Sequence, residues 1–173
     1  MTNRCADDIT KYGIEQNRVP QIYPTRRCEI CDWAVLRNYC LGGRGIVTLE
    51  NPETGKHHTY EFRRPNNPEK FAYDTLFIYV LVKECTWMYL GMFNHSNNCF
   101  KLTRSSKFGN SSKLVKGARY IVNKITNGSK KSVEPMKFYH EGVCAICGRK
   151  LTTPKSIQNG IGPRCKKVLD SRL

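Results

Sequence analysis

The end of the chain carries four side chains that could bind one metal ion. They are spaced as His140-x3-Cys144-x2-Cys147-x17-Cys165. A Cys-x2-Cys pair places two sulfur atoms on one tight turn, and tetrahedral zinc sites use Cys and His ligands at such spacings. We therefore expect these four residues to bind one Zn²⁺ ion.

The residues around the four ligands predict how they are positioned. Gly148 directly follows the Cys-x2-Cys pair, where a glycine can adopt a positive φ without a Cβ clash. Gly162-Pro163 is typical of a helix start, with proline at the first helical position. Cys165 would then lie in the first turn of that helix, where the helix dipole favours the thiolate over the thiol.

The number of ligands bears on whether the zinc is structural or catalytic. Four protein ligands close a site, whereas a catalytic zinc usually has three and keeps one open position. With His140 as the fourth ligand we expect a structural zinc, no catalytic residues and no enzyme. If His140 is not a ligand, three cysteines leave an open position, and a zinc-dependent hydrolase is the alternative. The zinc deaminase signature does not fit, because Glu141 directly follows His140 and Val143 precedes Cys144.

A second group of cysteines lies near the start of the chain. Its Cys-x2-Cys pair, Cys28 and Cys31, could hold a second Zn²⁺ ion together with Cys40 and a fourth ligand, which is either Cys5 or one of His57 and His58. The alternative is a reduced pair on a helical turn with no metal. The members of this second candidate site are Cys5, Cys28, Cys31 and Cys40.

The charge of the chain is unevenly distributed. Residues 1–100 carry 12 Lys or Arg against 11 Asp or Glu, whereas residues 101–173 carry 17 against three, out of a net charge of +15. An excess of this kind favours a polyanionic partner, most commonly nucleic acid. The alternative is a basic surface without a specific partner. The scarcity of carboxylates in the basic half disfavours a carboxylate-based nuclease there.

Basic residues surround the C-terminal candidate site. A helix N-terminus with flanking cations can bind phosphate, and such contacts position a nucleic acid without reading its sequence. Tyr139, and the strand residues Trp87, Tyr89 and Phe93, could stack on unpaired bases or pack in the core. The residues that we expect to contact phosphates are Arg149, Lys150, Lys155, Arg164, Lys166 and Lys167.

Neither membrane insertion nor export is indicated. The chain has no run of about 18 or more apolar residues, and its first residues contain no apolar segment of a secretory signal. We expect a cytoplasmic protein whose nine cysteines are metal ligands or reduced thiols rather than a disulfide framework. No phosphate-binding Gly-x4-Gly-Lys motif occurs, and no small-molecule substrate is inferred.

The hydrophobic pattern predicts an α+β fold in three segments. Residues 1–44 form a cysteine-containing lead with a short helix from Ile9 to Val19, residues 45–128 a β-rich body, and residues 129–173 a basic zinc-binding module. The body is expected to be a small antiparallel β-sheet or a partly open barrel with one packed helix, which runs from Ser111 or Ser112 to about Ile125. Five strands are expected in it, at 46–49, 57–63, 75–82, 87–93 and 99–103, and a further strand leads from Met136 into the metal site.

The last third of the chain resembles a family of small, uncharacterised phage and bacterial proteins, known as a domain of unknown function. The resemblance rests on about 26 residues, from His140-Glu141-Gly142 through Cys144-x2-Cys147-Gly148-Arg149 to Gly160-Ile161-Gly162-Pro163-x-Cys165. The preceding β-rich region and helix look more loosely like the body of those proteins, whereas the lead with Cys5 falls outside the pattern. The resemblance implies a zinc-binding, phage-encoded protein but no established activity.

Two classes of function remain after these observations. One is a basic, zinc-binding nucleic-acid-binding protein, an accessory factor of phage replication, recombination or transcription. The other is a phage protein-interaction module that docks on a host nucleoprotein machine and inhibits it. The sequence does not distinguish DNA from RNA, or single from double strands.

Overall fold

The structure, a computed structural model, describes residues 28–67, 71, 73–127 and 133–171. Cys5 and the helix predicted from Ile9 to Val19 lie outside the described residues.

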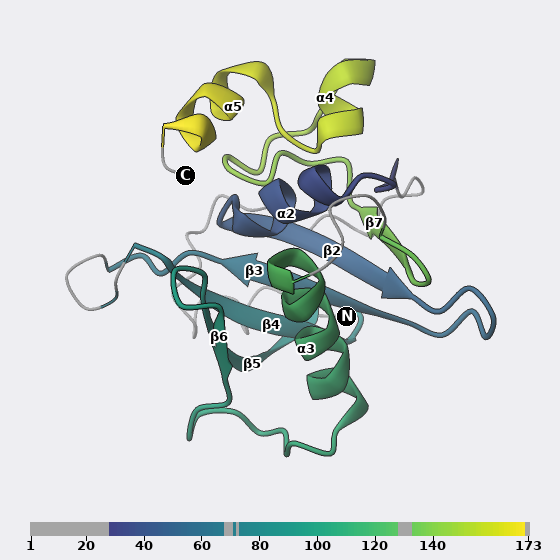
Figure 1. Ribbon diagram of the computed structural model, residues 1–173, viewed down its shortest axis with the longest axis vertical. Helices are drawn as coiled ribbons and strands as arrows, with labels where there is room; N and C mark the ends of the chain where they lie inside the picture. The colour runs from purple at the N-terminus through teal and green to yellow at the C-terminus, as the bar shows by residue number, and fades with distance from the viewer. Residues whose placement is uncertain (1–27, 68–70, 72, 128–132, 172–173) are drawn as a thin grey trace, which may run out of the picture.

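One antiparallel sheet forms the centre of the molecule, and it confirms the predicted α+β class (Figure 1). Its spatial order is β1-β7-β2-β3-β4-β5-β6, and each neighbouring pair is antiparallel. Strands β1 and β6 are the two edges, so the sheet is open and does not close into a barrel. The seven strands are β1 (Cys28–Glu29), β2 (Arg44–Glu50), β3 (His57–Arg63), β4 (Thr75–Lys83), β5 (Thr86–Asn94), β6 (Cys99–Lys101) and β7 (Lys137–His140).

The long helix of the body forms where its apolar pattern predicts it. Helix α3 (Lys113–Asn127) has an apolar stripe at spacings of three and four, and this stripe is buried against the sheet. The hydroxyl of Tyr60 in β3 donates to the carbonyl oxygen of Leu114 over 3.0 Å. A Cβ atom on Gly117 would lie 2.1 Å from that hydroxyl oxygen, so the close approach of helix and strand requires glycine. The buried residues of α3 are Val115, Ala118, Ile121, Val122 and Ile125.

A helix that was not predicted follows the first Cys-x2-Cys pair. Helix α2 (Trp33–Leu41) begins after Asp32, whose carboxylate accepts a hydrogen bond from the amide of Val35 over 2.9 Å. Trp33 donates from Nε1 to the carbonyl oxygen of Lys124, 2.8 Å away, which fixes α2 beside α3. Its buried side chains, Leu36, Tyr39, Cys40 and Leu41, join the same core as α3.

The three predicted segments contribute to one sheet and one core. β1 comes from the predicted lead, β2 from the predicted body and β7 from the predicted C-terminal module, yet β7 pairs with both other strands. Figure 1 shows α2 between the sheet and the two short C-terminal helices, α4 (Pro154–Asn159) and α5 (Pro163–Asp170). In the part of the chain that the structure describes, no helix combines the length and apolar character needed to cross a membrane.

Candidate metal centre

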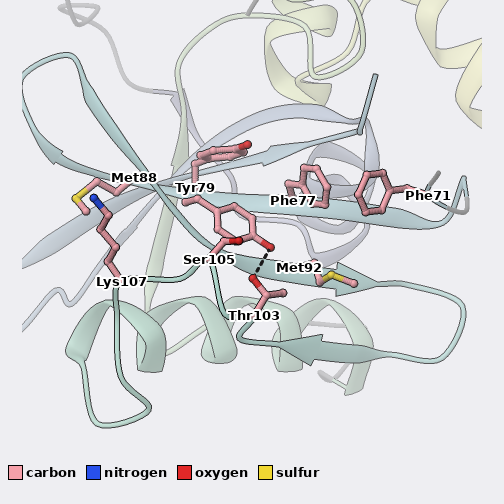
Figure 2. A pocket seen from close by; sticks show the side chains of 9 residues that line it. Phe71, Phe77, Tyr79, Met88, Met92, Thr103, Ser105 and Lys107 are labelled. Carbon is pink, nitrogen blue, oxygen red and sulfur yellow. Dashed lines mark hydrogen bonds between the residues drawn. The ribbon is translucent and has the colours of Figure 1, made fainter. Parts of the chain in front are cut away.

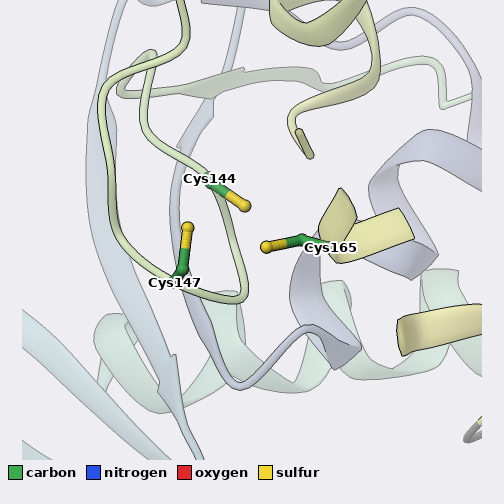
Figure 3. A group of neighbouring side chains, drawn as sticks. All are labelled: Cys144, Cys147 and Cys165. Atoms are coloured by element: carbon green, nitrogen blue, oxygen red, sulfur yellow. The ribbon is translucent and has the colours of Figure 1, made fainter. Parts of the chain in front are cut away.

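Three of the four predicted ligands come together. The Sγ atoms of Cys144, Cys147 and Cys165 all lie within 4.8 Å of one another, and in Figure 3 the three thiols point toward a common centre. Sulfur atoms bound to one tetrahedral zinc at about 2.3 Å would lie about 3.8 Å apart, so small side-chain adjustments would suffice to bind the ion. The donor set and its spacing therefore suit a zinc ion.

The first two thiols are held by a tight hairpin. Strand-like pairing of Val143 with Lys150 brings the two arms of the hairpin together. Within it, the amide of Cys144 donates to the carbonyl oxygen of Arg149, and the amide of Gly148 donates to the carbonyl oxygen of Cys144, each over 2.8 Å. Gly148 has a φ of 72°, which confirms the positive φ expected after the Cys-x2-Cys pair.

The third thiol is placed by a helix start. Gly162 precedes α5 in an extended conformation, Pro163 occupies the first turn, and Cys165 lies two residues further along. The predicted helix start at Gly162-Pro163 is thus confirmed. Cys165 thereby faces the hairpin from the N-terminal end of the helix, where backbone amides stabilise negative charge.

Contacts with the body anchor the hairpin, and sequence spacing alone did not reveal them. The amide of Arg44 in β2 donates to the carbonyl oxygen of Ala145 over 2.7 Å, and the amide of Ala145 donates to the carbonyl oxygen of Gly160 over 3.1 Å. A Cβ atom on Gly160 would lie 2.4 Å from the ring of Tyr39 in α2. The segment between α4 and α5 is therefore pressed directly against the body.

The thiols differ in how readily they lose a proton. Burial raises the pKa of Cys144, but the backbone amides of Cys147, Gly162 and Ile146 donate hydrogen bonds to its sulfur and lower the pKa below its usual value overall. Burial, together with the two neighbouring thiols, raises the pKa of Cys165 to about 12, so the thiol is favoured and the thiolate predicted from the helix start is not. Because a metal binds thiolates, metal binding must displace the protons that the crowded thiols otherwise keep.

His140 is not part of the cluster, which corrects the predicted four-ligand site. Its side chain is fully buried, Nε2 donates to the carbonyl oxygen of Ile157 over 2.8 Å, and Nδ1 accepts a hydrogen bond from the amide of Gly142 over 3.1 Å. Burial lowers the pKa of the imidazole, only partly opposed by the bond to Ile157. Both ring nitrogens of the neutral imidazole are therefore engaged with backbone groups.

The second predicted site is not assembled from the described residues. Cys40 is fully buried in the hydrophobic core, where burial raises the pKa of its thiol, whereas Cys31 is exposed and Cys28 lies in β1. His57 is exposed and contacts its own turn at Gly55. Among the described residues, the only group of three or more close metal-ligating side chains is the C-terminal cluster of thiols. Cys5 lies outside those residues, so its predicted role stays a prediction.

All six residues that we expect to contact phosphates are exposed. Two lie on the returning arm of the hairpin, one in the first turn of α4 and three in α5, so they belong to the same segment as the thiol cluster. No acidic residue occupies the first turn of α5, and no side chain caps its N-terminus. These residues are Arg149, Lys150, Lys155, Arg164, Lys166 and Lys167.

The aromatic residues considered for base stacking have different surroundings. Phe93 is fully buried in the core, which confirms core packing for this residue. Trp87, Tyr89 and Tyr139 are partly exposed.

Comparison with known proteins gives one finding about this region. Residues 134–170 match the family model DUF6011, described as a family of unknown function. This stretch contains β7, the thiol cluster, α4 and α5. No curated protein and no solved structure matches the chain.

Proposed function

We propose that this protein binds one zinc ion as a structural centre and uses the basic surface around it to bind the phosphates of a nucleic acid. The observation that carries the proposal is that six exposed cations lie on the hairpin, on α4 and on α5, the same short segment that carries the cluster of three thiols. A zinc bound to the thiols would fix the hairpin relative to the start of α5, and so would fix these cations relative to one another. Cations held in this way bind a regularly spaced row of phosphates.

The balance of charge supports the same role. Asp170, and Glu141, which is buried, are the only acidic side chains between 141 and 171. Exposed positive charge with so little opposing charge attracts a polyanion, and the distance over which this attraction acts decreases as the salt concentration rises. The resemblance of this segment to small phage and bacterial proteins supports an accessory factor of phage replication, recombination or transcription.

A salt titration tests the proposal directly. The affinity of the zinc-loaded protein for labelled single- and double-stranded oligonucleotides is measured by fluorescence anisotropy between about 50 and about 200 mM salt. We expect the logarithm of the binding constant to fall linearly with the logarithm of salt concentration, because phosphate contacts release counterions. A binding constant that hardly changes with ionic strength would rule out phosphate binding.

A pull-down experiment with the same purified protein distinguishes nucleic-acid binding from docking on a host nucleoprotein machine. A pull-down from nuclease-treated lysate removes partners that are held through nucleic acid. A protein that stays bound after this treatment, together with a flat salt titration, would favour the protein-interaction module instead. Loss of all partners after treatment, together with a steep titration, supports the proposed function.

A zinc-dependent hydrolase is the second candidate, because the structure brings together three protein ligands and not four. Such an enzyme also needs an acid or base beside the open position. Among the described residues no His, Asp or Glu ligand atom joins the three thiols. We propose the structural role because the three thiols would connect the hairpin to the start of α5 through the ion, and the fourth ligand stays unassigned.

A further inference from the structure

A pocket of about 480 Å³ lies far from the thiol cluster in the sequence, on strands β4 and β5 and the segment after β6. Its volume falls in the range of about 300–1,000 Å³ that is usual for small-ligand sites. Phe77 and Tyr79 of β4 alternate with Leu76, Ile78 and Val80, which are buried in the core, so these two lining side chains are directed away from the core face of the strand. The described residues that line the pocket are Phe71, Phe77, Tyr79, Met88, Tyr89, Met92, Thr103, Ser105 and Lys107.

Aromatic rings form most of one wall. The ring centroids of Phe71 and Phe77 are 4.9 Å apart, those of Phe77 and Tyr89 5.8 Å, and those of Tyr79 and Tyr89 5.5 Å. The interplanar angles are 83°, 87° and 69°, so these rings meet edge to face and do not stack on one another. The guanidinium of Arg63 already lies 4.4 Å from the ring centroid of Tyr79, so Phe77 and Tyr89 are the rings that we expect to contact a flat, aromatic ligand. Met88 and Met92 would add polarisable contacts to such a ring.

The other wall is polar and ends in a positive charge. Thr103 donates from Oγ1 to the hydroxyl oxygen of Tyr89 over 3.3 Å, which holds that ring in place. In the view of Figure 2, Lys107 and Met88 are drawn toward one end of the pocket and Phe71 toward the opposite end. Lys107 is exposed, and residues 101–127 contain seven Lys or Arg but no Asp or Glu. The pocket therefore combines a place for a flat ring with a nearby place for an anion.

We propose that this pocket binds one unpaired base of a single-stranded nucleic acid, with the aromatic wall against the base and Lys107 beside the adjoining phosphate. A flat ring next to a negative charge is the chemistry of a nucleotide unit, and proteins that bind single strands combine aromatic platforms with basic grooves in this way. The inference rests on the proposed function and adds a second contact region to it. It predicts a preference for single strands over duplexes, whose bases are stacked and paired.

Two probes of equal charge separate base binding from phosphate binding. One is a labelled oligothymidine of about 16 nucleotides, and the other is an oligomer of the same length that consists of abasic sites. We expect the zinc-loaded, full-length protein to bind the oligothymidine about tenfold more tightly, since stacking of one base is typically sufficient for such a ratio. Tyr89→Ala should bring the ratio close to one, whereas Tyr73→Ala, which removes an exposed tyrosine outside the pocket lining, should leave it unchanged.

A second pair of variants keeps the inference testable if Tyr89→Ala does not fold. Ser105→Trp adds a bulky side chain at an exposed position of the lining, and it should lower the ratio without changing the affinity for the abasic oligomer. Lys107→Glu should weaken binding of both oligomers, more than Lys83→Glu does, because Lys83 is also exposed but lies outside the lining. Circular dichroism and the thermal midpoint establish that each variant is folded.

The outcomes separate the two proposals. Equal, strongly salt-dependent affinities for both oligomers would overturn the base-binding pocket and leave phosphate binding by the zinc module intact. No binding of either oligomer at low salt would overturn the pocket's role, and no binding of a duplex of the same length as well would overturn the proposed function. A ratio of about ten that Ser105→Trp and Tyr89→Ala leave unchanged would also overturn the inference, because the base would then be bound elsewhere.

Discussion

The imidazole of His140 donates from Nε2 to the carbonyl oxygen of Ile157, 2.8 Å away, and so connects the end of β7 to the last turn of α4. Its other nitrogen accepts the amide of Gly142 at the start of the thiol hairpin. One fully buried side chain thus joins the sheet, the hairpin and α4. His140, which has the sequence spacing of a metal ligand, instead holds the thiol hairpin and α4 in place through these two hydrogen bonds.

The first prediction concerns zinc content. Cys147→Ser should reduce zinc well below one ion per chain and lower the thermal midpoint, because a structural zinc contributes folding free energy. Cys31→Ser is the matched control, since both residues are exposed second cysteines of a Cys-x2-Cys pair. Elemental analysis of purified protein makes the comparison. Equal zinc content in the two variants would contradict the assignment of the ligands.

The second prediction separates His140 from the metal. His140→Gln should destabilise the protein by about 1–3 kcal/mol, because buried backbone groups at Ile157 and Gly142 lose well-placed partners. The folded variant should still contain one zinc per chain, as measured by elemental analysis after size-exclusion chromatography. A folded variant that has lost its zinc would restore His140 as a ligand.

The third prediction concerns pH. Burial lowers the pKa of His140 in the folded protein, so the unfolded chain binds a proton at higher pH than the folded one does. The contribution of His140 to stability is therefore complete above the unfolded pKa of about 6.5, and it is lost as the pH falls below that value. The difference in unfolding free energy between wild type and His140→Gln should narrow from about pH 7.5 to about pH 5.5. Urea denaturation measures it, and a difference that is constant over this range would contradict the prediction.

The fourth prediction tests how the body presses on the zinc-binding segment. Gly160 and Gly55 have φ values of 66° and 67°, but a Cβ atom would strike the ring of Tyr39 only at Gly160 and would meet nothing within 4 Å at Gly55. Gly55→Ala should therefore cost only the backbone strain, about 1 kcal/mol, whereas Gly160→Ala should cost clearly more. Denaturant unfolding measures both. Equal losses would show that the segment can move away from α2 freely.

The fifth prediction concerns the phosphate contacts. Lys166→Ala combined with Lys167→Ala should weaken nucleic-acid binding and reduce the salt slope on duplex DNA by about two, without a change in the thermal midpoint. The control is Lys56→Ala combined with Lys83→Ala, which removes the same charge at exposed positions in the first hundred residues. Similar losses of affinity in the two double variants would mean that only the net charge matters.

Much of the local structure around the thiols could be predicted because short-range geometry determines it. The Cys-x2-Cys spacing requires a tight turn, Gly148 permits the positive φ that the turn needs, and Pro163 suits only the first turn of a helix. The apolar stripe of α3 likewise shows which helix face is buried. In each case the preference arises within a few residues of the chain.

Other features depended on which segments approach one another in space. A histidine four residues before a cysteine can be a ligand or a buried support, and only the placement of Ile157 and Gly142 decided this for His140. Cys40 likewise resembles a ligand in the sequence, although Asp32 and the apolar spacing after it contain the signal for α2. The pairing of β7 with β1 and β2, and the pocket on β4 and β5, bring together residues distant in sequence. The sequence by itself determined the type of metal chemistry and the excess of positive charge. The tertiary structure decided which candidate ligands come together. The physical reason is that a histidine or cysteine can bind a metal, form backbone hydrogen bonds or pack in the core, and long-range contacts select among these, as they do for His140 and Cys40.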